Sequence, residues 1–124
     1  MNITQLTLAA AIAVLPLAPA AAQSAPGDRV AVVVSIPTPA QATDAYLRAA
    51  MEKSVPQYQA IPGLVRKYFT IGNGTFGGIY YWTSKAAAEA WFNETWYARV
   101  KQSYGVPAQV TYFAVPLAID GTKP

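Results

Sequence analysis

Several aromatic side chains are spaced along this chain so that they can line one ligand-binding cavity. Tyr80 and Trp82 alternate along a predicted strand and therefore share one of its faces. Trp96 and Arg99 lie about one turn apart on a predicted helix. A cavity between sheet and helices lined by such rings would suit a flat apolar ligand. The residues predicted to line it are Tyr68, Tyr80, Trp82 and Trp96, with Arg99 as the charge that reaches into it.

Each of these residues also has a simpler interpretation. Most of the rings could belong to the hydrophobic core or to a dimer interface, where Tyr and Trp need partners for their polar atoms. Arg99 could be a solvated charge on the outer face of its helix. Both interpretations stay open on the sequence alone.

The composition excludes much of enzyme chemistry. The chain has no histidine and no cysteine, so Ser-His-Asp and Cys-His nucleophilic sites and the usual zinc, non-haem iron and haem ligand sets are absent. Its few acidic residues show no ligand-like spacing: Asp28, Asp44, Glu52, Glu89, Glu94 and Asp120. No metal site and no bound cofactor are predicted.

A glycine-rich segment, Gly72 to Gly77, matches the G-x-G-x-x-G pattern of dinucleotide-binding sites. That motif requires a helix after the last glycine, to hold the pyrophosphate at its N-terminus. Here the following residues, Ile79 to Trp82, are typical of a strand. The glycines therefore predict a hairpin turn.

The N-terminal segment predicts export. Residues 6–17 carry no charge and are apolar apart from Thr7, and Ala20 and Ala22 supply the small residues of an A-x-A cleavage site. We predict a signal peptide at residues 1–22, a flexible mature N-terminus at 23–28, and a periplasmic or extracellular location. A retained N-terminal anchor is the alternative, but the apolar run is short for a membrane span, which needs about 20 residues. After cleavage no membrane anchor is expected.

The mature chain of about 100 residues has the length of one ordinary domain. The formal net charge is +3, and no cluster of Lys and Arg indicates nucleic-acid binding. Since there are no cysteines, stability must come from packing or assembly.

The residue patterns predict four strands, in which β-branched and aromatic residues gather at residues 29–35, 64–71, 77–83 and 109–115. A first helix is expected from Pro39, capped by Thr38, to residue 55, with Pro56 ending it. A second, bent helical region should begin after Thr83 or Ser84 and end at Gly105. The order βαββαβ predicts an α+β, ferredoxin-like domain at residues 29–120, with a tail at 121–124. Its four-stranded antiparallel sheet should carry helices on one face.

The strands expected at the centre of this sheet have no charge on either face. In residues 31–35 and 78–82 both faces carry apolar or small residues, whereas a sheet face exposed to water normally carries polar residues. Because monomers rarely expose a large apolar patch, we expect a second copy to cover the open face, which gives a back-to-back homodimer. Local cover of a merely hydrophobic strand is the alternative.

These segments together resemble a known family, the YdhR-like monooxygenases of the dimeric α/β-barrel superfamily. The resemblance rests on Pro62-Gly63-Leu64, Gly77-Gly78-Ile79-Tyr80, Trp82, the alanine-rich helix, Trp96 to Arg99, and Phe113-Ala114-Val115-Pro116. It covers most of the mature chain and implies a ferredoxin-like monomer that pairs through its sheet.

The resemblance also implies an activity. Related small enzymes oxygenate electron-rich aromatic molecules without metal or flavin, because the deprotonated substrate itself activates oxygen. The hypothesis is therefore a cofactor-independent monooxygenase for a small aromatic or quinol-type molecule, with Arg99 as the catalytic group that steadies an anionic oxygen. The alternatives are a non-catalytic dimeric module that binds a small apolar ligand, and a structural dimer whose cavity is closed.

Overall fold

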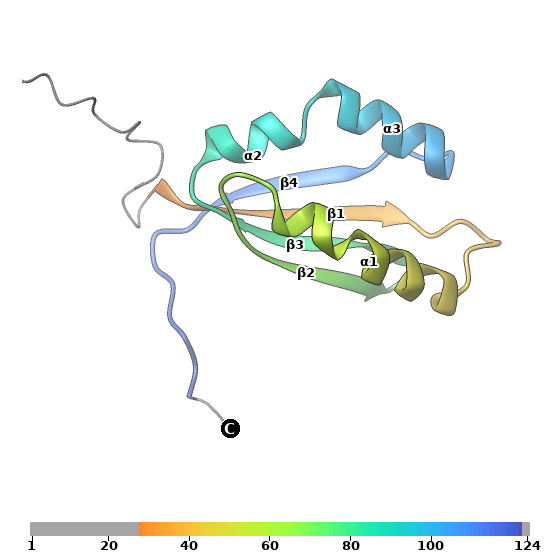
Figure 1. The fold of residues 1–124 in the computed structure, drawn as a ribbon, viewed down its shortest axis with the longest axis horizontal. Helices are drawn as coiled ribbons and strands as arrows, with labels where there is room; N and C mark the ends of the chain where they lie inside the picture. Colours follow the sequence, from red (N-terminus) through yellow and green to blue (C-terminus); the bar gives the residue numbers. More distant parts are fainter. Residues whose placement is uncertain (1–27, 123–124) are drawn as a thin grey trace, which may run out of the picture.

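The computed structural model describes residues 28–122, which form one antiparallel sheet with helices against one of its faces (Figure 1). In chain order the elements are β1 (Val30–Pro37), α1 (Asp44–Gln59), β2 (Leu64–Gly72), β3 (Thr75–Trp82), α2 (Lys85–Trp91), α3 (Glu94–Tyr104) and β4 (Gln109–Ala114). The four strands are arranged in the order β2-β3-β1-β4. This is the predicted ferredoxin-like βαββαβ fold, with α2 and α3 together in the second helical position. The predicted signal peptide lies outside the described residues, and within them no helix is long and apolar enough to cross a membrane.

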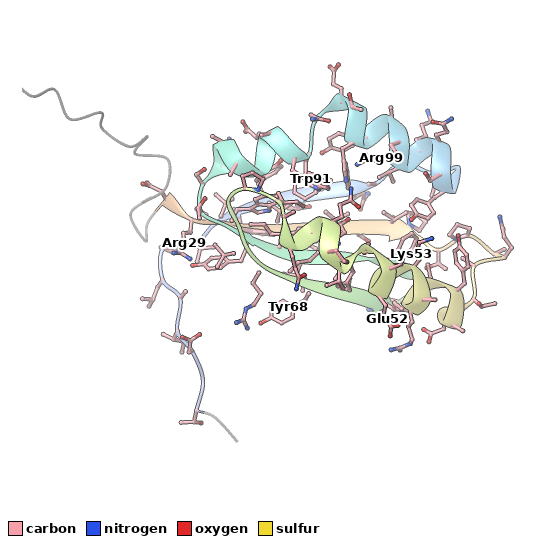
Figure 2. The ribbon with its side chains drawn as sticks, in the orientation of Figure 1. Arg29, Glu52, Lys53, Tyr68, Trp91 and Arg99 are labelled. Carbon is pink, nitrogen blue, oxygen red and sulfur yellow. The ribbon has the colours of Figure 1, made fainter. Side chains whose placement is uncertain are left out.

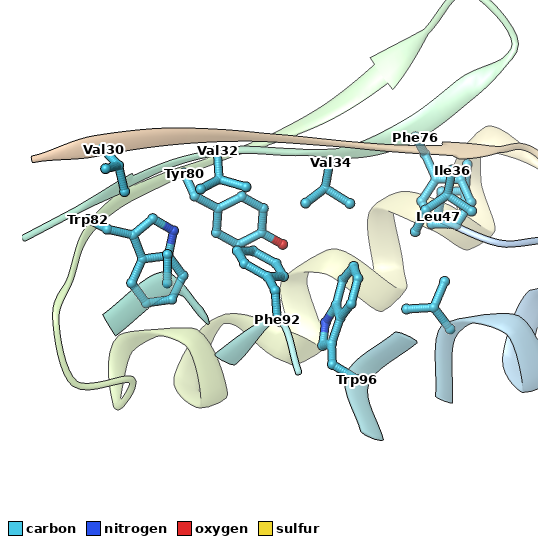
Figure 3. Close-up of a cluster of buried hydrophobic side chains, with 12 residues drawn as sticks. Val30, Val32, Val34, Ile36, Leu47, Phe76, Tyr80, Trp82, Phe92 and Trp96 are labelled. Carbon is cyan, nitrogen blue, oxygen red and sulfur yellow. The ribbon is translucent and has the colours of Figure 1, made fainter. Parts of the chain in front are cut away.

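The two central strands bury alternate side chains against the helices, as a half-covered sheet requires. In β1 the buried residues are Val30, Val32, Val34 and Ile36. In β3 they are Phe76, Gly78, Tyr80 and Trp82. Figure 3 shows Tyr80 and Trp82 next to Phe92 and Trp96, which come from the connection between α2 and α3 and from α3, and shows Ile36 and Phe76 next to Leu47 of α1. The core thus lies between the helix-side face of the sheet and the helices.

The hairpin between β2 and β3 has the two-residue loop that the glycine-rich segment predicts. Asn73 and Gly74 both have positive φ, 54° and 72°, as a type I′ turn requires. Gly72 pairs with Thr75 on either side of the loop. The prediction of a hairpin in place of a dinucleotide-binding motif is therefore confirmed.

Helix α1 differs from its prediction at both ends. Its N-cap is Thr43, whose hydroxyl accepts a hydrogen bond from the backbone N–H of Tyr46 at 3.1 Å, so the prediction of Thr38 as cap was wrong. Pro56 does not end the helix, which continues to Gln59. The extra turn places Tyr58 among other aromatic rings, and this packing outweighs the one backbone hydrogen bond that proline cannot donate.

The other face of the sheet has no covering element among the described residues. Val33, Ile79 and Phe113 point to this face and are 36%, 43% and 51% exposed. The register pairs Val33 with Ile79 of β3 and Ala31, on the same side of β1, with Phe113 of β4, so the exposed apolar side chains are neighbours across the three strands. We call this surface the open face.

Candidate functional site

A cavity of about 340 Å³ lies between the helix-side face of the sheet and helices α1 and α3. Its walls are rich in aromatic residues, with Val34, Leu47 and Met51 among the aliphatic contributors. The main rings are those of Tyr58, Phe69, Tyr80, Trp91, Trp96 and Tyr104. This volume is at the lower end of the range of about 300–1,000 Å³ that is typical of small-molecule sites.

The side chain of Lys67 enters this cavity from β2. Lys67 is paired with Tyr80 of β3, and cross-strand partners point to the same side of a sheet. Its Nζ lies 3.2 Å from the ring centroid of Tyr58, 3.9 Å from that of Phe69 and 4.6 Å from that of Tyr80. Three rings from two strands and α1 therefore surround one amine.

Burial lowers the pKa of Lys67 from 10.5 to about 7. Within residues 28–122 the salt bridges join Asp44 to Arg48 and Lys85 to Glu89, and neither includes Lys67. The ring faces favour the ammonium form, but a nearby carboxylate would favour it far more. Near neutral pH, Lys67 is therefore partly a neutral amine.

Gly78 makes the room for this lysine. A Cβ at Gly78 would lie 2.8 Å from Cε of Lys67 and 3.0 Å from Cε2 of Tyr80. Real carbon atoms do not approach so closely, so a larger residue here would displace the lysine stem from its place beside the rings. The absence of a side chain at Gly78 thus helps to position the amine.

The hydroxyls of Tyr80 and Tyr104 remain protonated at neutral pH. Burial raises the pKa of Tyr80 well above its usual value, and the neighbouring Tyr58 adds to the rise. Burial also raises the pKa of Tyr104, with smaller contributions from Tyr46 and Tyr58. These groups supply hydrogen bonds but no negative charge that could neutralise Lys67.

Arg99 of α3 and Trp91 of α2 lie close together at one side of the cavity. Arg99 of α3 lines the cavity from its exposed side, with its guanidinium carbon 6.0 Å from the ring centroid of Trp91. The indole N–H of Trp91 is buried and has no hydrogen-bond partner. The cavity therefore combines aromatic walls with a guanidinium group that suits an oxygen-bearing ligand.

Three of the five residues predicted for the site lie together in the cavity: Tyr80, Trp96 and Arg99. Trp82 is fully buried behind the cavity, where its ring stacks on Tyr80 at 6.1 Å and packs against Phe92 at 5.7 Å. Trp82 therefore supports the wall and does not line it.

Tyr68 lies on the opposite side of the sheet from the cavity, which corrects its predicted position. It is paired with Ile79, so it points to the open face, and it is 55% exposed. There its hydroxyl accepts a hydrogen bond from Nη1 of Arg66 at 3.2 Å. Figure 2 shows Tyr68 below the sheet, away from Trp91 and Arg99.

Sequence reasoning missed the two residues that give the cavity its character, Lys67 and Tyr58. A lysine in a half-exposed strand is normally interpreted as a charge on the protein surface. Tyr58 lies beyond Pro56, the residue that was expected to end α1. One signal was present in the sequence. Lys67, Phe69 and Ile71 stand two residues apart, so their side chains point to the same side of the strand, and the two apolar residues indicate that this is the buried side. Among residues 28–122 no group of acidic side chains is arranged to hold a metal ion.

Comparison with known proteins gives matches only among solved structures. No family model matches the chain, and no curated protein does. A protein of unknown function from Nitrosomonas europaea superposes with a TM-score of 0.60 at 14% identity, over 80% of this chain and 100% of that one. SnoaB, a cofactor-independent oxygenase from Streptomyces nogalater, gives 0.55 at 14% identity, over 76% of this chain and 99% of that one.

A third similar structure is the monooxygenase from the gene ActVA-Orf6 of Streptomyces coelicolor, in complex with nanaomycin D. Its TM-score is 0.55 at 18% identity, over 77% of this chain and 93% of that one. The structural neighbours thus include antibiotic-biosynthesis monooxygenase-like proteins, and the chain shares their ferredoxin-like fold. At such identities the similarity shows the fold alone. The narrower resemblance to YdhR-like monooxygenases stays a prediction.

Proposed function

We propose that this protein is a cofactor-independent monooxygenase that acts on a small aromatic or quinol-type molecule bound in the aromatic cavity. The observation that carries the proposal is the cavity itself: ring-lined walls of about 340 Å³ with Lys67 and Arg99 as its positive groups. Aromatic walls favour a flat ligand through stacking and edge-to-face contacts. The positive groups favour one that carries, or can develop, a negative oxygen. Oxygenase activity in proteins of the same fold supports this assignment.

The proposed chemistry needs no external reductant. A phenol that becomes a quinone gains one oxygen atom and loses two hydrogen atoms. The second atom of dioxygen leaves with those hydrogens as water, so the substrate supplies every electron. The protein must bind the substrate, stabilise its anion and exclude bulk water. Arg99, at the exposed side of the cavity, is placed to steady the anionic oxygen.

The proposal is tested by oxygen uptake with a panel of hydroquinones, naphthols and anthrones. We expect saturable uptake of one dioxygen per substrate, with one atom of isotopically labelled dioxygen in the product. Arg99→Gln should lower kcat/KM by about 10- to 100-fold, since a hydrogen bond to a charged group contributes about 1.5–3 kcal/mol. Arg48→Gln is the matched control, because Arg48 is exposed on α1 and pairs with Asp44 at 2.6 Å. Saturable binding without turnover of any compound would overturn the enzyme assignment and leave a binding module.

We also propose that two copies pair through the open face. The support is the contiguous row of exposed apolar side chains on β1, β3 and β4, which a monomer would leave in water. The segment after β4 adds Leu117 and Ile119, which are 80% and 86% exposed and could extend the contact onto the second copy. Pairing of the sheets would leave the cavities facing outward on the helix side of each copy.

Export is part of the same proposal and rests on residues 1–22, the predicted signal peptide. Outside the cytoplasm the enzyme has no supply of reduced nicotinamide or flavin, and cofactor-independent chemistry suits such a place. The mass of the protein recovered from the periplasm or medium should correspond to a chain that begins at Gln23. A mass that includes Met1 would contradict cleavage.

A further inference from the structure

The proposed oxygenation needs a base to remove the substrate's proton, and Lys67 is an amine inside the cavity. It enters the cavity on the buried side of β2, held between the rings of Tyr58, Phe69 and Tyr80. The titratable and charged side chains that share the cavity come from α1, β3 and α3: Tyr46, Tyr58, Tyr80, Arg99 and Tyr104. None of them is a carboxylate, so no acidic side chain of the cavity lining can pair with an ammonium group.

This arrangement makes the charge of Lys67 depend on what the cavity holds. Without an anion, burial favours the neutral amine. Once an anionic ligand lies beside Nζ, the ammonium gains an opposite charge at short range, and the three ring faces stabilise it further. The rings thus stabilise the cation that forms when the amine takes up a proton, and they are in place before it forms.

We propose that Lys67 is the base that accepts the phenolic proton of an aromatic ligand, so that the cavity binds phenols as phenolates. This inference rests on the proposed function, since it names the step that generates the electron-rich anion. The O–H bond of the phenol breaks and an N–H bond forms at Nζ of Lys67. The products are an ammonium and a phenolate, and no electron is transferred in this step.

The other polar groups of the cavity cannot take this role. The guanidinium of Arg99 carries only N–H donors and has no lone pair to offer. Tyr80 and Tyr104 hold their own protons more firmly than usual because of burial, so their anions are not available as bases. Arg99 can assist by holding the phenolate oxygen after the proton has moved.

The test is a spectroscopic titration with 2-naphthol under argon, because its anion absorbs at longer wavelengths than its neutral form. The buffer is set about one unit below the pKa of the free phenol, so that most unbound phenol is neutral, and this pH lies above the pKa of Lys67, about 7, so that the amine is neutral before the phenol binds. Wild-type protein should convert the bound fraction to the phenolate, which corresponds to a fall of at least about tenfold in its proton affinity. Lys67→Met should bind the phenol without this conversion. Lys53→Met, which removes an exposed lysine from α1, should behave as wild type.

A second measurement uses only the wild-type chain, so it does not depend on the folding of a variant. The side-chain NMR signal of Lys67 should titrate at a higher pH with 2-naphthol than without it. The inference is overturned if the bound phenol stays neutral, if Lys67→Met converts it equally well, if the Lys67 titration does not move, or if wild type shows no saturable binding.

The outcome is separable from that of the proposed function because argon removes dioxygen. Phenolate formation without turnover in air would support Lys67 as base and contradict the monooxygenase. Under air, Lys67→Met should lower kcat/KM by about 100-fold or more, the usual effect of losing a general base. Undiminished turnover by that variant would remove Lys67 from the reaction and leave the monooxygenase standing.

Discussion

Replacing Lys67 by methionine should raise the free energy of unfolding below pH 7 by about 2–4 kcal/mol. Methionine fills the same space without a charge, whereas the folded wild type must hold an ammonium in an aromatic cavity. A fall in pKa from 10.5 to about 7 corresponds to about 5 kcal/mol for a fully buried amine, and solvent at the cavity mouth reduces this figure.

The advantage of Lys67→Met should disappear as the pH rises. In the unfolded chain Lys67 keeps its proton up to its ordinary pKa of 10.5, but in the folded chain it releases the proton near pH 7. Between these values the unfolded state binds more protons, so the stability of the wild type increases with pH in this window. Below pH 7 Lys67 is protonated in both states, and the full cost of burying its charge remains.

Tyr80 has the opposite effect at higher pH, because its pKa is raised on folding. Above about pH 10 its hydroxyl stays protonated in the folded state and ionises in the unfolded chain, which lowers the stability again.

Urea unfolding of both proteins at about pH 6, 8 and 10 measures this effect. The two stability curves should converge toward pH 10. Lys53→Met is the matched control, because Lys53 is exposed on α1 and its loss should shift the curve without changing its slope (Figure 2). Parallel curves for wild type and Lys67→Met would contradict a lowered pKa in the folded state.

The fold was predictable because its signals are local. Four β-branched or aromatic runs, separated by glycine and proline turns, define the strands, and the Asn73-Gly74 loop joins two of them. The alanine-rich α2 begins after its cap Ser84, and α3 ends at Gly105 in the left-handed conformation, both as expected. Each of these features depends on a few neighbouring residues.

The site was only partly predictable because it depends on which strand faces meet. The register of β2 against β3, with an irregularity between Leu64 and Arg66, pairs Lys67 with Tyr80 and Tyr68 with Ile79. The partial burial of Phe69 and Ile71 fixes which side of β2 faces the helices. Lys67 lies on that same side, and its amine loses contact with water as a result. If the pairing of β2 with β3 is not known, the adjacent residues Lys67 and Tyr68 give no indication of which one is buried.

The C-terminal end of α1 was mispredicted for a similar reason, because it depends on contacts between residues that are distant in the sequence. Proline is a strong local stop signal, but the helix passes Pro56 because Tyr58 packs against Phe69 at 5.5 Å and Trp91 at 5.8 Å. Those two residues are distant from Tyr58 in the sequence, so no local pattern predicts that they contact it. The ring that lies closest to Lys67 therefore comes from a turn that sequence reasoning had ended too early.

Substituting Val33 by lysine should convert the protein from a dimer to a monomer. Val33 lies on the central strand β1, between Ile79 and Thr111, in the middle of the open face. In a sheet-to-sheet dimer each copy would bury one unpaired ammonium against apolar side chains, which costs several kcal/mol per charge. A loss of about 4 kcal/mol weakens association roughly 1,000-fold.

Light scattering at micromolar concentration should give the mass of two chains for wild type and of one chain for Val33→Lys. Ala49→Lys adds the same charge at an exposed position of α1 and should remain dimeric. Circular dichroism separates dissociation from unfolding, and since Val33 is already 36% exposed within one copy, the variant monomer should keep its fold. A wild-type monomer, or an unchanged mass for Val33→Lys, would refute pairing through this face. Because Val33 and Lys67 point to opposite sides of the sheet, a folded Val33→Lys monomer should still convert bound 2-naphthol to its anion. Each copy then carries a complete cavity, and the dimer serves to cover the sheet.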